Sequence, residues 1–244
     1  MSIKQIFGLV TSPLKSVIFP STCKICGKFL EGEEKVVCAD CLSRAEIHRG
    51  EACQVCGRFF YFKEGTSFVC HECLKEPPPF TRHRAVGSYS GILKQMIILF
   101  KYRQHESLKR PLTRLMRRSP EIQRLFEGLD LVIPVPLHPT RLKERGFNQA
   151  ELLAEEISRE VGIPVARKVL IKRRKTLSQV SLEAEERKHN LSGAFSVRKA
   201  EKIAGKVILL VDDVFTTGST CRECSRVLLE FGAKEVRVLT LARA

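Results

Sequence analysis

The stretch of sequence that decides the fold is VILLVDDVFTTGST, residues 207–220. It begins with five apolar residues rich in Val, Ile and Leu, which is typical of a strand at the centre of a parallel sheet that is covered on both faces. Two carboxylates, Asp212 and Asp213, come next, and a turn of hydroxyl residues around Gly218 then opens a helix. Because open parallel sheets bind ligands outside the carboxyl ends of their strands, the stretch predicts a binding site at this point.

The turn after the two aspartates has the residues of a phosphate-binding loop. Backbone N–H groups and hydroxyls at the N-terminus of a helix can hold a phosphate dianion. Asp212 and Asp213 are placed to accept hydrogen bonds from vicinal ribose hydroxyls or to hold hydrated Mg²⁺. The alternative is an ordinary strand end with capping Asp and Ser side chains. The residues predicted to bind the phosphate are Thr216, Thr217, Gly218, Ser219 and Thr220.

Strands and helices alternate on either side of this stretch. Helical periodicity covers residues 146–161 and 219–231. Further strands are expected at residues 129–136, 165–171, 193–197 and 235–242. This alternation predicts an α/β domain with a parallel, doubly wound sheet. Residues 83–118, with a strand-like segment and two basic helices, are expected to form a hood in front of it.

Eight of the ten cysteines form four C-x2-C pairs within the first 73 residues. Two such pairs at this spacing can close a tetrahedral thiolate site around Zn²⁺, and the whole unit occurs twice. We expect two structural zinc ions, because four sulfur ligands leave no coordination position for a substrate. Sequential pairing of the ligands is favoured, although the spacing also allows crossed pairing; reduced, buried thiols are the alternative. The expected ligands are Cys23, Cys26, Cys38, Cys41, Cys53, Cys56, Cys70 and Cys73.

The remaining cysteines and the first residues carry weaker signals. Cys221 and Cys224 have no second pair nearby, so we expect two thiols on the packed face of a helix. His71 is expected at the surface. Metal-binding cysteine pairs without a visible export signal favour a cytoplasmic location. Residues 1–19 are too short and too broken by charges to span a bilayer and are expected to form a leading helix that packs on the body, with peripheral contact at the inner face of the membrane as the alternative.

The composition favours a folded protein with a polyanionic ligand. Apolar residues make up 43% of the chain, which excludes a disordered protein, and the formal net charge is +15. Residues 80–118 hold ten Lys and Arg against one acidic residue, and residues 165–175 hold six against none. Charge concentrated in this way favours phosphorylated metabolites or nucleic acid as ligands over a merely solvated basic face.

A run of three prolines at residues 77–79 suits a boundary between domains, because it forms a stiff, extended spacer. We therefore expect four parts in the chain. They are a leading helix at 1–19, a double zinc-ribbon module at 20–76, a linker with the basic hood at 77–128, and the α/β core at 129–244.

The segment VDDVFTTGST resembles the phosphoribosyl diphosphate (PRPP) motif of type I phosphoribosyltransferases. Two further stretches, IPVPLHPTRLKERGFNQAELLA at residues 133–154 and SQVSLEAEERKHNLSGAF at residues 178–195, together with the paired zinc knuckles, are similar to the ComF competence protein family. The resemblance covers almost the whole chain. It implies a phosphoribosyltransferase-like core with a hood, preceded by a Cys-rich double zinc-knuckle module, and a role in DNA uptake during natural transformation.

The resemblance also implies roles for individual residues. Residues 137–145 correspond to the pyrophosphate loop of the family, and residues 172–190 to the mobile loop that closes over PRPP. The residues that would contact PRPP and its leaving group are Leu137, His138, Arg141, Arg145, Arg173, Arg174, Lys175 and Gln179. On the basic hood, the residues that would contact nucleic acid are Lys101, Tyr102, Arg103, Arg117 and Arg118.

One position departs from the purine-salvage members of this fold. Those enzymes carry an aspartate two residues before the loop glycine, where this chain has Thr216. Transfer by this protein, if it is an enzyme, would follow the orotate-like pattern without an enzymic general base. Mg²⁺ and the arginines would then stabilise the departing pyrophosphate, and Asp212 and Asp213 would hold the ribose.

Three functions are compatible with these observations. The favoured hypothesis is a DNA-uptake protein that binds PRPP with Mg²⁺ in the crevice and single-stranded DNA on its basic rim. The first alternative is an active phosphoribosyltransferase of nucleotide metabolism. The second alternative is a zinc-ribbon adaptor that docks to a helicase or translocon protein and has an inert core.

Overall fold

The computed structural model describes residues 21–30, 36–60, 68–102, 105–174, 191 and 193–244. The chain divides into two compact units, residues 1–45 and residues 46–244. The leading helix expected at residues 1–19 lies outside the described residues. The second compact unit contains the second cysteine cluster as well as the α/β core.

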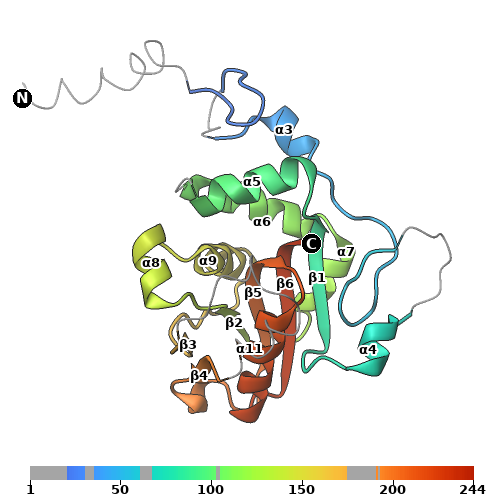
Figure 1. Ribbon diagram of the computed structural model, residues 1–244, viewed down its shortest axis with the longest axis vertical. Coiled ribbons are helices and arrows are strands. Elements are labelled where there is room, and N and C mark those ends of the chain that lie inside the picture. Colours follow the sequence, from blue (N-terminus) through green and yellow to red (C-terminus); the bar gives the residue numbers. More distant parts are fainter. Residues whose placement is uncertain (1–20, 31–35, 61–67, 103–104, 175–190, 192) are drawn as a thin grey trace, which may run out of the picture. The chain divides into compact units, whose positions relative to one another are not determined.

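Four parallel strands form the central sheet of the second unit, in the order β1-β6-β5-β2 (Figure 1). Their bounds are Arg82–Ser88 for β1, Leu131–Pro134 for β2, Val207–Phe215 for β5 and Glu235–Arg243 for β6. Strand β5 lies between β6 and β2, and its residues 207–211 are all buried, as expected of an interior strand. Asp212 then stands opposite Thr240 on β6. The parallel α/β fold predicted from the sequence is confirmed.

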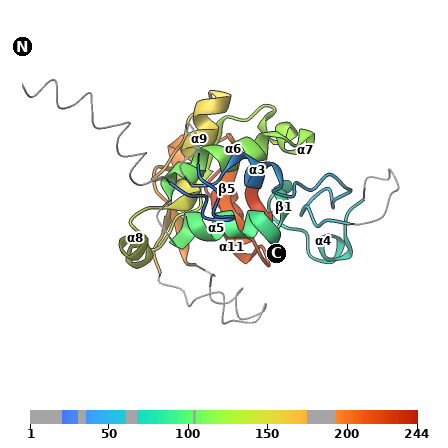
Figure 2. The same cartoon turned by 90° about the horizontal axis from the view of Figure 1, so that it is seen from above.

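Helices α9 (Gln149–Val161) and α11 (Ser219–Glu230) lie on opposite sides of β5 (Figure 2). Helix α9 begins where the Asn148 side chain accepts a hydrogen bond from the amide of Ala150 at 3.1 Å. It ends at Gly162, whose φ of 74° places it in the left-handed region that favours glycine. The apolar face of α9 is buried against β2 and β5, and this packing fixes the helix on the sheet.

The predicted hood contains two helices, α5 (Gly91–Tyr102) and α6 (Lys109–Arg117). Figures 1 and 2 show both helices over the carboxyl ends of the strands. Helix α6 packs on α9, and α5 contacts β6. Phe100 of α5 is fully buried, so its ring belongs to the hydrophobic core.

Two segments differ from the sequence expectation. Pro139–Arg145 forms helix α8 where a loop was expected. Pro139 suits the first position of a helix, and His138 Nδ1 caps it by accepting a hydrogen bond from the amide of Thr140 at 3.3 Å. Of the strand expected at 165–171, only Leu170–Lys172 (β3) forms as a strand, and it pairs antiparallel with β4 (Phe195–Val197).

The other elements are short. They are α3 (Ala39–Ser43), α4 (His71–Lys75), α7 (Pro120–Gln123), η1 (Glu106–Leu108), η2 (Arg124–Phe126) and η4 (Ala200–Lys202). Within the described part of the chain, no helix combines the length and the hydropathy needed to cross a bilayer.

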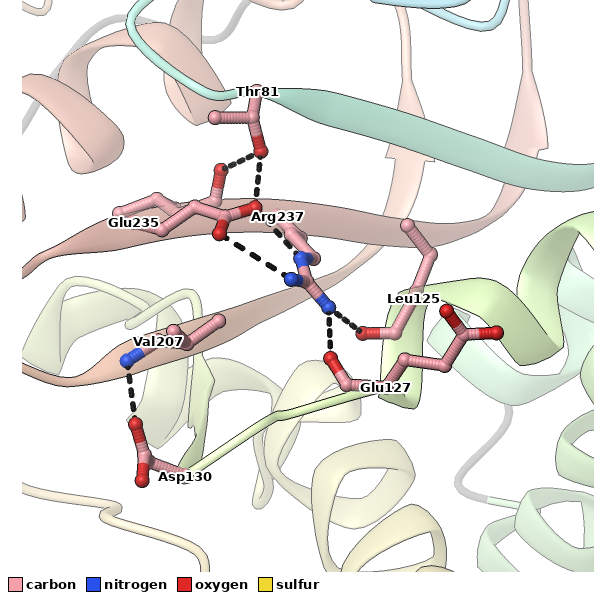
Figure 3. Close-up of polar contacts among 8 residues, drawn as sticks. Thr81, Leu125, Glu127, Asp130, Val207, Glu235 and Arg237 are labelled. Carbon is pink, nitrogen blue, oxygen red and sulfur yellow. Dashed lines mark hydrogen bonds and ion pairs between the residues drawn. The ribbon is translucent and has the colours of Figure 1, made fainter.

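A polar network holds the amino end of β6 (Figure 3). The Arg237 guanidinium donates to the carbonyl of Glu127 at 2.6 Å and to the carboxylate of Glu235 at 2.7 Å. The same carboxylate accepts a hydrogen bond from the Thr81 hydroxyl at 2.7 Å, immediately before β1 begins. Because this network lies at the opposite end of the strands from Asp212, it supports the sheet and takes no part in the candidate site.

Candidate functional site

The two aspartates lie near the carboxyl end of the central strand β5. Asp213 is buried and Asp212 is half-buried, and Asp212 Oδ1 accepts a hydrogen bond from the amide of Asp213 at 2.8 Å. Burial, reinforced by the neighbouring charge of Asp213, raises the pKa of Asp212 to about 7. Two neighbouring carboxylates with this burial and mutual repulsion favour a ligand that brings hydrogen-bond donors or a cation.

The turn after β5 presents a set of backbone donors. Within the described residues, the amides of Thr216, Thr217 and Gly218 have no hydrogen-bond acceptor. The Thr217 hydroxyl lies 2.8 Å from the Ser219 hydroxyl and accepts a bond from the Ser219 amide at 3.4 Å. The turn is followed directly by α11, so its N–H groups stand at a helix N-terminus. This arrangement is that of an anion site.

Glycine is required at residue 218 for two reasons. Its φ is 78°, in the left-handed region, and an added Cβ would lie 2.2 Å from Cζ of Phe215. The turn is therefore closed tightly over the Phe215 ring, and a side chain at this position would push it open.

A lysine of the hood forms an ion pair with one of the two aspartates. Lys101 Nζ, from the last turn of α5, lies 2.9 Å from Asp213 Oδ2. Although burial by itself lowers the pKa of Lys101, the charge and hydrogen bond of Asp213 outweigh it, and the pKa is raised. The carbonyl of Lys101 accepts a hydrogen bond from the Gln149 side chain at 3.2 Å. The contact therefore ties the hood to β5 and α9 around the site.

Both cysteine clusters have the geometry of a zinc site. In each cluster the four Sγ atoms lie within 4.8 Å of one another, and the clusters contain Cys23, Cys26, Cys38 and Cys41, and Cys53, Cys56, Cys70 and Cys73. The Sγ–Sγ distances include 3.9, 3.7 and 3.6 Å. A tetrahedron with Zn–S bonds of about 2.3 Å has edges of about 3.8 Å, so both sets fit Zn²⁺. The ligands pair sequentially, as favoured from the sequence, and crossed pairing is excluded.

The two zinc ribbons have the same arrangement of polar contacts. An ion pair links the knuckle to the following short helix in each ribbon, Lys28 with Asp40 at 3.5 Å and Arg58 with Glu72 at 2.6 Å. In each ribbon an amide also donates to a ligand sulfur, from Cys38 to Cys23 Sγ at 3.4 Å and from Cys70 to Cys53 Sγ at 3.3 Å. Such N–H bonds stabilise the thiolate form that binds the metal.

Two family models match the chain. A double zinc ribbon domain matches residues 14–83, and a phosphoribosyl transferase domain matches residues 146–244. The second range contains β5, both aspartates, the turn and α11.

Several named proteins match most of the chain. The chain is 36% identical to competence protein F of Haemophilus influenzae, over 72% of this chain and 78% of that protein. The chain belongs to the competence protein F family. It is also 33% identical to DNA utilization protein YhgH of Escherichia coli K12, over 92% of this chain and 97% of that protein. Competence protein ComFC of Bacillus subtilis is 30% identical, over 88% of each chain. The resemblance inferred from the sequence is confirmed.

The solved structures to which this competence protein F homologue is similar are more distant. A glutamine PRPP amidotransferase from Bacillus subtilis is 23% identical, with a TM-score of 0.38, over 55% of this chain and 26% of that chain. A hypoxanthine phosphoribosyltransferase from Staphylococcus aureus is 14% identical, with a TM-score of 0.35, over 57% of this chain and 64% of that chain.

The residues assigned to the pyrophosphate loop lie on and around α8. Leu137, His138, Arg141 and Arg145 are all half-buried. Arg145 donates to the Gln149 side chain at 3.3 Å, and its charge acts on Lys101. The end of α8 therefore lies close to Lys101 of the hood. Their contact with a diphosphate stays a prediction.

Lys172 was not assigned to the site from the sequence. It lies on β3, and burial lowers the pKa of its ammonium, which also feels the charges of Arg141 and Asp212. Lys172 therefore lies close enough to Arg141 of α8 and to Asp212 for their charges to act on it. The signal for Lys172 in the sequence is its place at the start of the basic run at residues 172–175, directly before Arg173 and Arg174.

The structure places the other assigned cations in different surroundings. Arg173 and Arg174 are exposed, and so is Arg118 at the end of α6. Arg117 forms an ion pair with Glu160 of α9 at 3.6 Å. Lys101, assigned to a nucleic-acid track, instead contacts Asp213 within the candidate site. Tyr102 is the last residue of α5, whereas Arg103, Lys175 and Gln179 lie outside the described residues.

Proposed function

We propose that this protein acts in DNA uptake, binds PRPP with Mg²⁺ at the end of β5, and binds single-stranded DNA on the basic rim of its hood and loop. The observation that carries the proposal is the combination, at one strand end, of two features. The turn has amides without an acceptor among the described residues, and Asp212 and Asp213 lie directly before it. A phosphate with a ribose ring attached satisfies both groups at once. The names of the relatives support the role in DNA uptake.

Each part of the site has a task in this proposal. The 5′-phosphate accepts hydrogen bonds from the amides of Thr216, Thr217 and Gly218, at the positive end of α11. The ribose hydroxyls donate to Asp212 and Asp213, and Lys101 then leaves Asp213 and turns its ammonium toward the phosphates. Mg²⁺, bound together with PRPP, would neutralise part of the diphosphate charge.

The proposal is tested by calorimetry with the zinc-loaded protein. PRPP with Mg²⁺ is expected to bind to one site, and ribose 5-phosphate is expected to bind more weakly, because it lacks the diphosphate. Inorganic pyrophosphate, which lacks the ribose and the 5′-phosphate, serves as the second control. No heat with PRPP, or equal affinity for pyrophosphate and PRPP, would show that the turn and the aspartates do not form the site.

The rim for DNA rests on exposed cations near the site. Arg173 and Arg174 are exposed at the start of the predicted mobile loop, and Arg114 and Arg118 are exposed on and beside α6. Among the described residues, neither Arg114 nor Arg118 forms an ion pair, so their charge is available to a polyanion. Single strands bind to such tracks with a strong dependence on salt.

Removing Arg173 and Arg174 is expected to weaken the binding of a single-stranded oligonucleotide. Each lost phosphate contact reduces the logarithmic salt slope by about 0.7, so the double Arg→Ala variant should lose a slope of about 1.4. The measurement is a fluorescence anisotropy titration at several salt concentrations.

A matched control removes the same charge elsewhere. Arg124 and Arg226 are exposed arginines held in ion pairs with Glu121 and with Glu223. The Arg124→Ala/Arg226→Ala variant is expected to keep the wild-type slope within about 0.3. Equal losses in the two double variants would mean that net charge, and not a track, governs the binding.

A further inference from the structure

The second zinc ribbon is joined to the edge strand of the core. The amide of His83, on β1, donates to the carbonyl of Val55 at 2.7 Å. The Arg84 guanidinium donates to the carbonyls of Cys53 at 3.3 Å and Gln54 at 3.0 Å. Val55 packs against the main hydrophobic core. The knuckle between the first two zinc ligands of this ribbon therefore takes the place of a neighbouring strand beside β1.

One carbonyl of this knuckle receives two side chains of the sheet. Cys56, a zinc ligand, accepts hydrogen bonds from His83 Nδ1 and Arg243 Nη1, each at 2.8 Å. Because a carbonyl can only accept, Nδ1 of His83 carries the ring proton, and Nε2 accepts from the Thr240 hydroxyl at 2.9 Å. His83 is fully buried, and these two hydrogen bonds hold its ring in a single orientation.

His83 and Arg243 both contact Phe215, the last residue of β5. The rings of His83 and Phe215 are stacked, with centroids 4.0 Å apart and planes inclined by 20°. The Arg243 guanidinium carbon lies 4.8 Å from the centre of the Phe215 ring. Phe215 directly precedes the phosphate-binding turn, and its ring is the surface against which Gly218 is packed. A continuous chain of contacts thus runs from a zinc ligand to the turn.

We infer that zinc in the second ribbon positions the phosphate-binding turn, through the Cys56 carbonyl, His83 and Phe215, and that zinc in the first ribbon does not. That the turn binds PRPP rests on the proposed function. That zinc positions the turn does not depend on it. His83 and Phe215 are positioning residues in this scheme. Because coupling between two sites is reciprocal in their affinities, PRPP in the turn should raise the affinity of the second ribbon for zinc.

The duplicated ribbons supply a matched pair of variants. Gly27 and Gly57 follow equivalent ligands and have φ values of 77° and 61°, so alanine is strained to a similar degree at both positions. An added Cβ at Gly57 would lie 2.6 Å from the carbonyl oxygen of His83, whereas at Gly27 it would meet no described atom within 4 Å. Gly57→Ala therefore pushes the knuckle away from His83, and Gly27→Ala strains its own turn alone.

Two readouts test the inference in proteins shown by metal analysis to hold two zinc ions. In Gly57→Ala, hydrogen exchange should become faster at the amides of Ser219 and Arg222, which donate to the Thr217 hydroxyl and to the Gly218 carbonyl. The dissociation constant for PRPP with Mg²⁺ should rise about two- to thirtyfold, the range for changes along a packed chain of residues. Gly27→Ala should match the wild type in both. Unchanged exchange at the turn of Gly57→Ala would overturn the inference. Faster exchange in a protein whose wild type binds no PRPP would keep the inference and refute the proposed function.

A second measurement decides the matter if Gly57→Ala does not fold. The Cys23→Ser/Cys26→Ser variant keeps only the second zinc site, and its zinc affinity is measured by equilibrium competition with a zinc-selective chelator, with and without PRPP and Mg²⁺. Tighter zinc binding with the ligand is expected. Equal zinc affinities in a protein that binds PRPP would overturn the inference.

Discussion

Replacing Cys53 and Cys56 with serine is expected to unfold the compact unit of residues 46–244, whereas the same change at Cys23 and Cys26 should leave that unit folded. Structural zinc contributes about 10–16 kcal/mol to the folding of small cysteine-rich modules. That is as large as the stability of a typical domain, about 5–15 kcal/mol. The second cluster is hydrogen-bonded to β1 and β6 of the sheet, while the first belongs to the other compact unit.

The two cysteine variants are each other's control. Both lose two thiolates and should retain one zinc ion by metal analysis. Thermal unfolding followed by circular dichroism should show a cooperative transition of the core for Cys23→Ser/Cys26→Ser and none for Cys53→Ser/Cys56→Ser. A core that melts at the wild-type temperature in both variants would contradict the expectation.

Neutralising both aspartates is expected to abolish PRPP binding. Hydrogen bonds to charged groups contribute about 1.5–3 kcal/mol each, so loss of both carboxylates should weaken the binding of PRPP with Mg²⁺ more than about a hundredfold. The Asp212→Asn/Asp213→Asn variant is compared with the wild type by calorimetry. Oligonucleotide binding, which is assigned to other residues, should be unchanged and serves as the control. Normal PRPP affinity in this variant would contradict the assignment of the PRPP site to Asp212 and Asp213.

The single change Asp212→Asn should stabilise the free protein as it destroys the site. The pKa of Asp212 is about 7 in the folded protein and about 3.8 without the fold, so the folded state holds its proton more tightly. The contribution of this group to stability is therefore lost as the pH rises from about 4 to about 7. Asparagine cannot ionise, so the variant should melt above the wild type at pH 8, by about 3 °C for each kcal/mol gained.

The pH dependence supplies the control for this prediction. The difference in melting temperature between Asp212→Asn and the wild type should shrink toward zero near pH 4, where both side chains are uncharged. A difference that is constant between pH 4 and pH 8 would mean that packing, and not the buried charge, separates the two proteins.

Local patterns in the sequence were sufficient for the strand, the turn and the helix of the site. The strand expected at residues 205–214 and the helix expected at 219–231 match β5 and α11 within two residues, because apolar runs and glycine stops act locally. Helix α8 was missed although its signals were present, with Pro139 at its first position and Gly146 after its end. A loop was expected there because residues 137–145 resemble the pyrophosphate loop of the family.

Contacts between distant segments could not be obtained in this way. The ion pair between Lys101 and Asp213 joins residues 112 positions apart, and no periodicity or spacing in the sequence indicates it. The attachment of the second ribbon to β1 is of the same kind. The domain boundary predicted at the proline run of residues 77–79 stays a prediction; the compact unit of residues 46–244 includes the second ribbon.

The basic hood also differs from its appearance in the sequence. Residues 80–118 have almost no acidic residues of their own, but α9 supplies them from outside. Arg110 pairs with Glu156 at 3.7 Å, and Arg117 pairs with Glu160 at 3.6 Å. Part of the positive charge of the hood is therefore neutralised by these ion pairs, and its basic surface is limited to the remaining exposed cations.

The place of β6 in the sheet has a consequence for biosynthesis. It is the last of the four strands to leave the ribosome, yet it lies between β1 and β5 and pairs with both. Until it is made, the newly synthesised chain exposes two unpaired strand edges, which are sites for association between chains. We therefore expect nascent protein stalled before residue 235 to aggregate or to require a chaperone, however completely its zinc ribbons have formed.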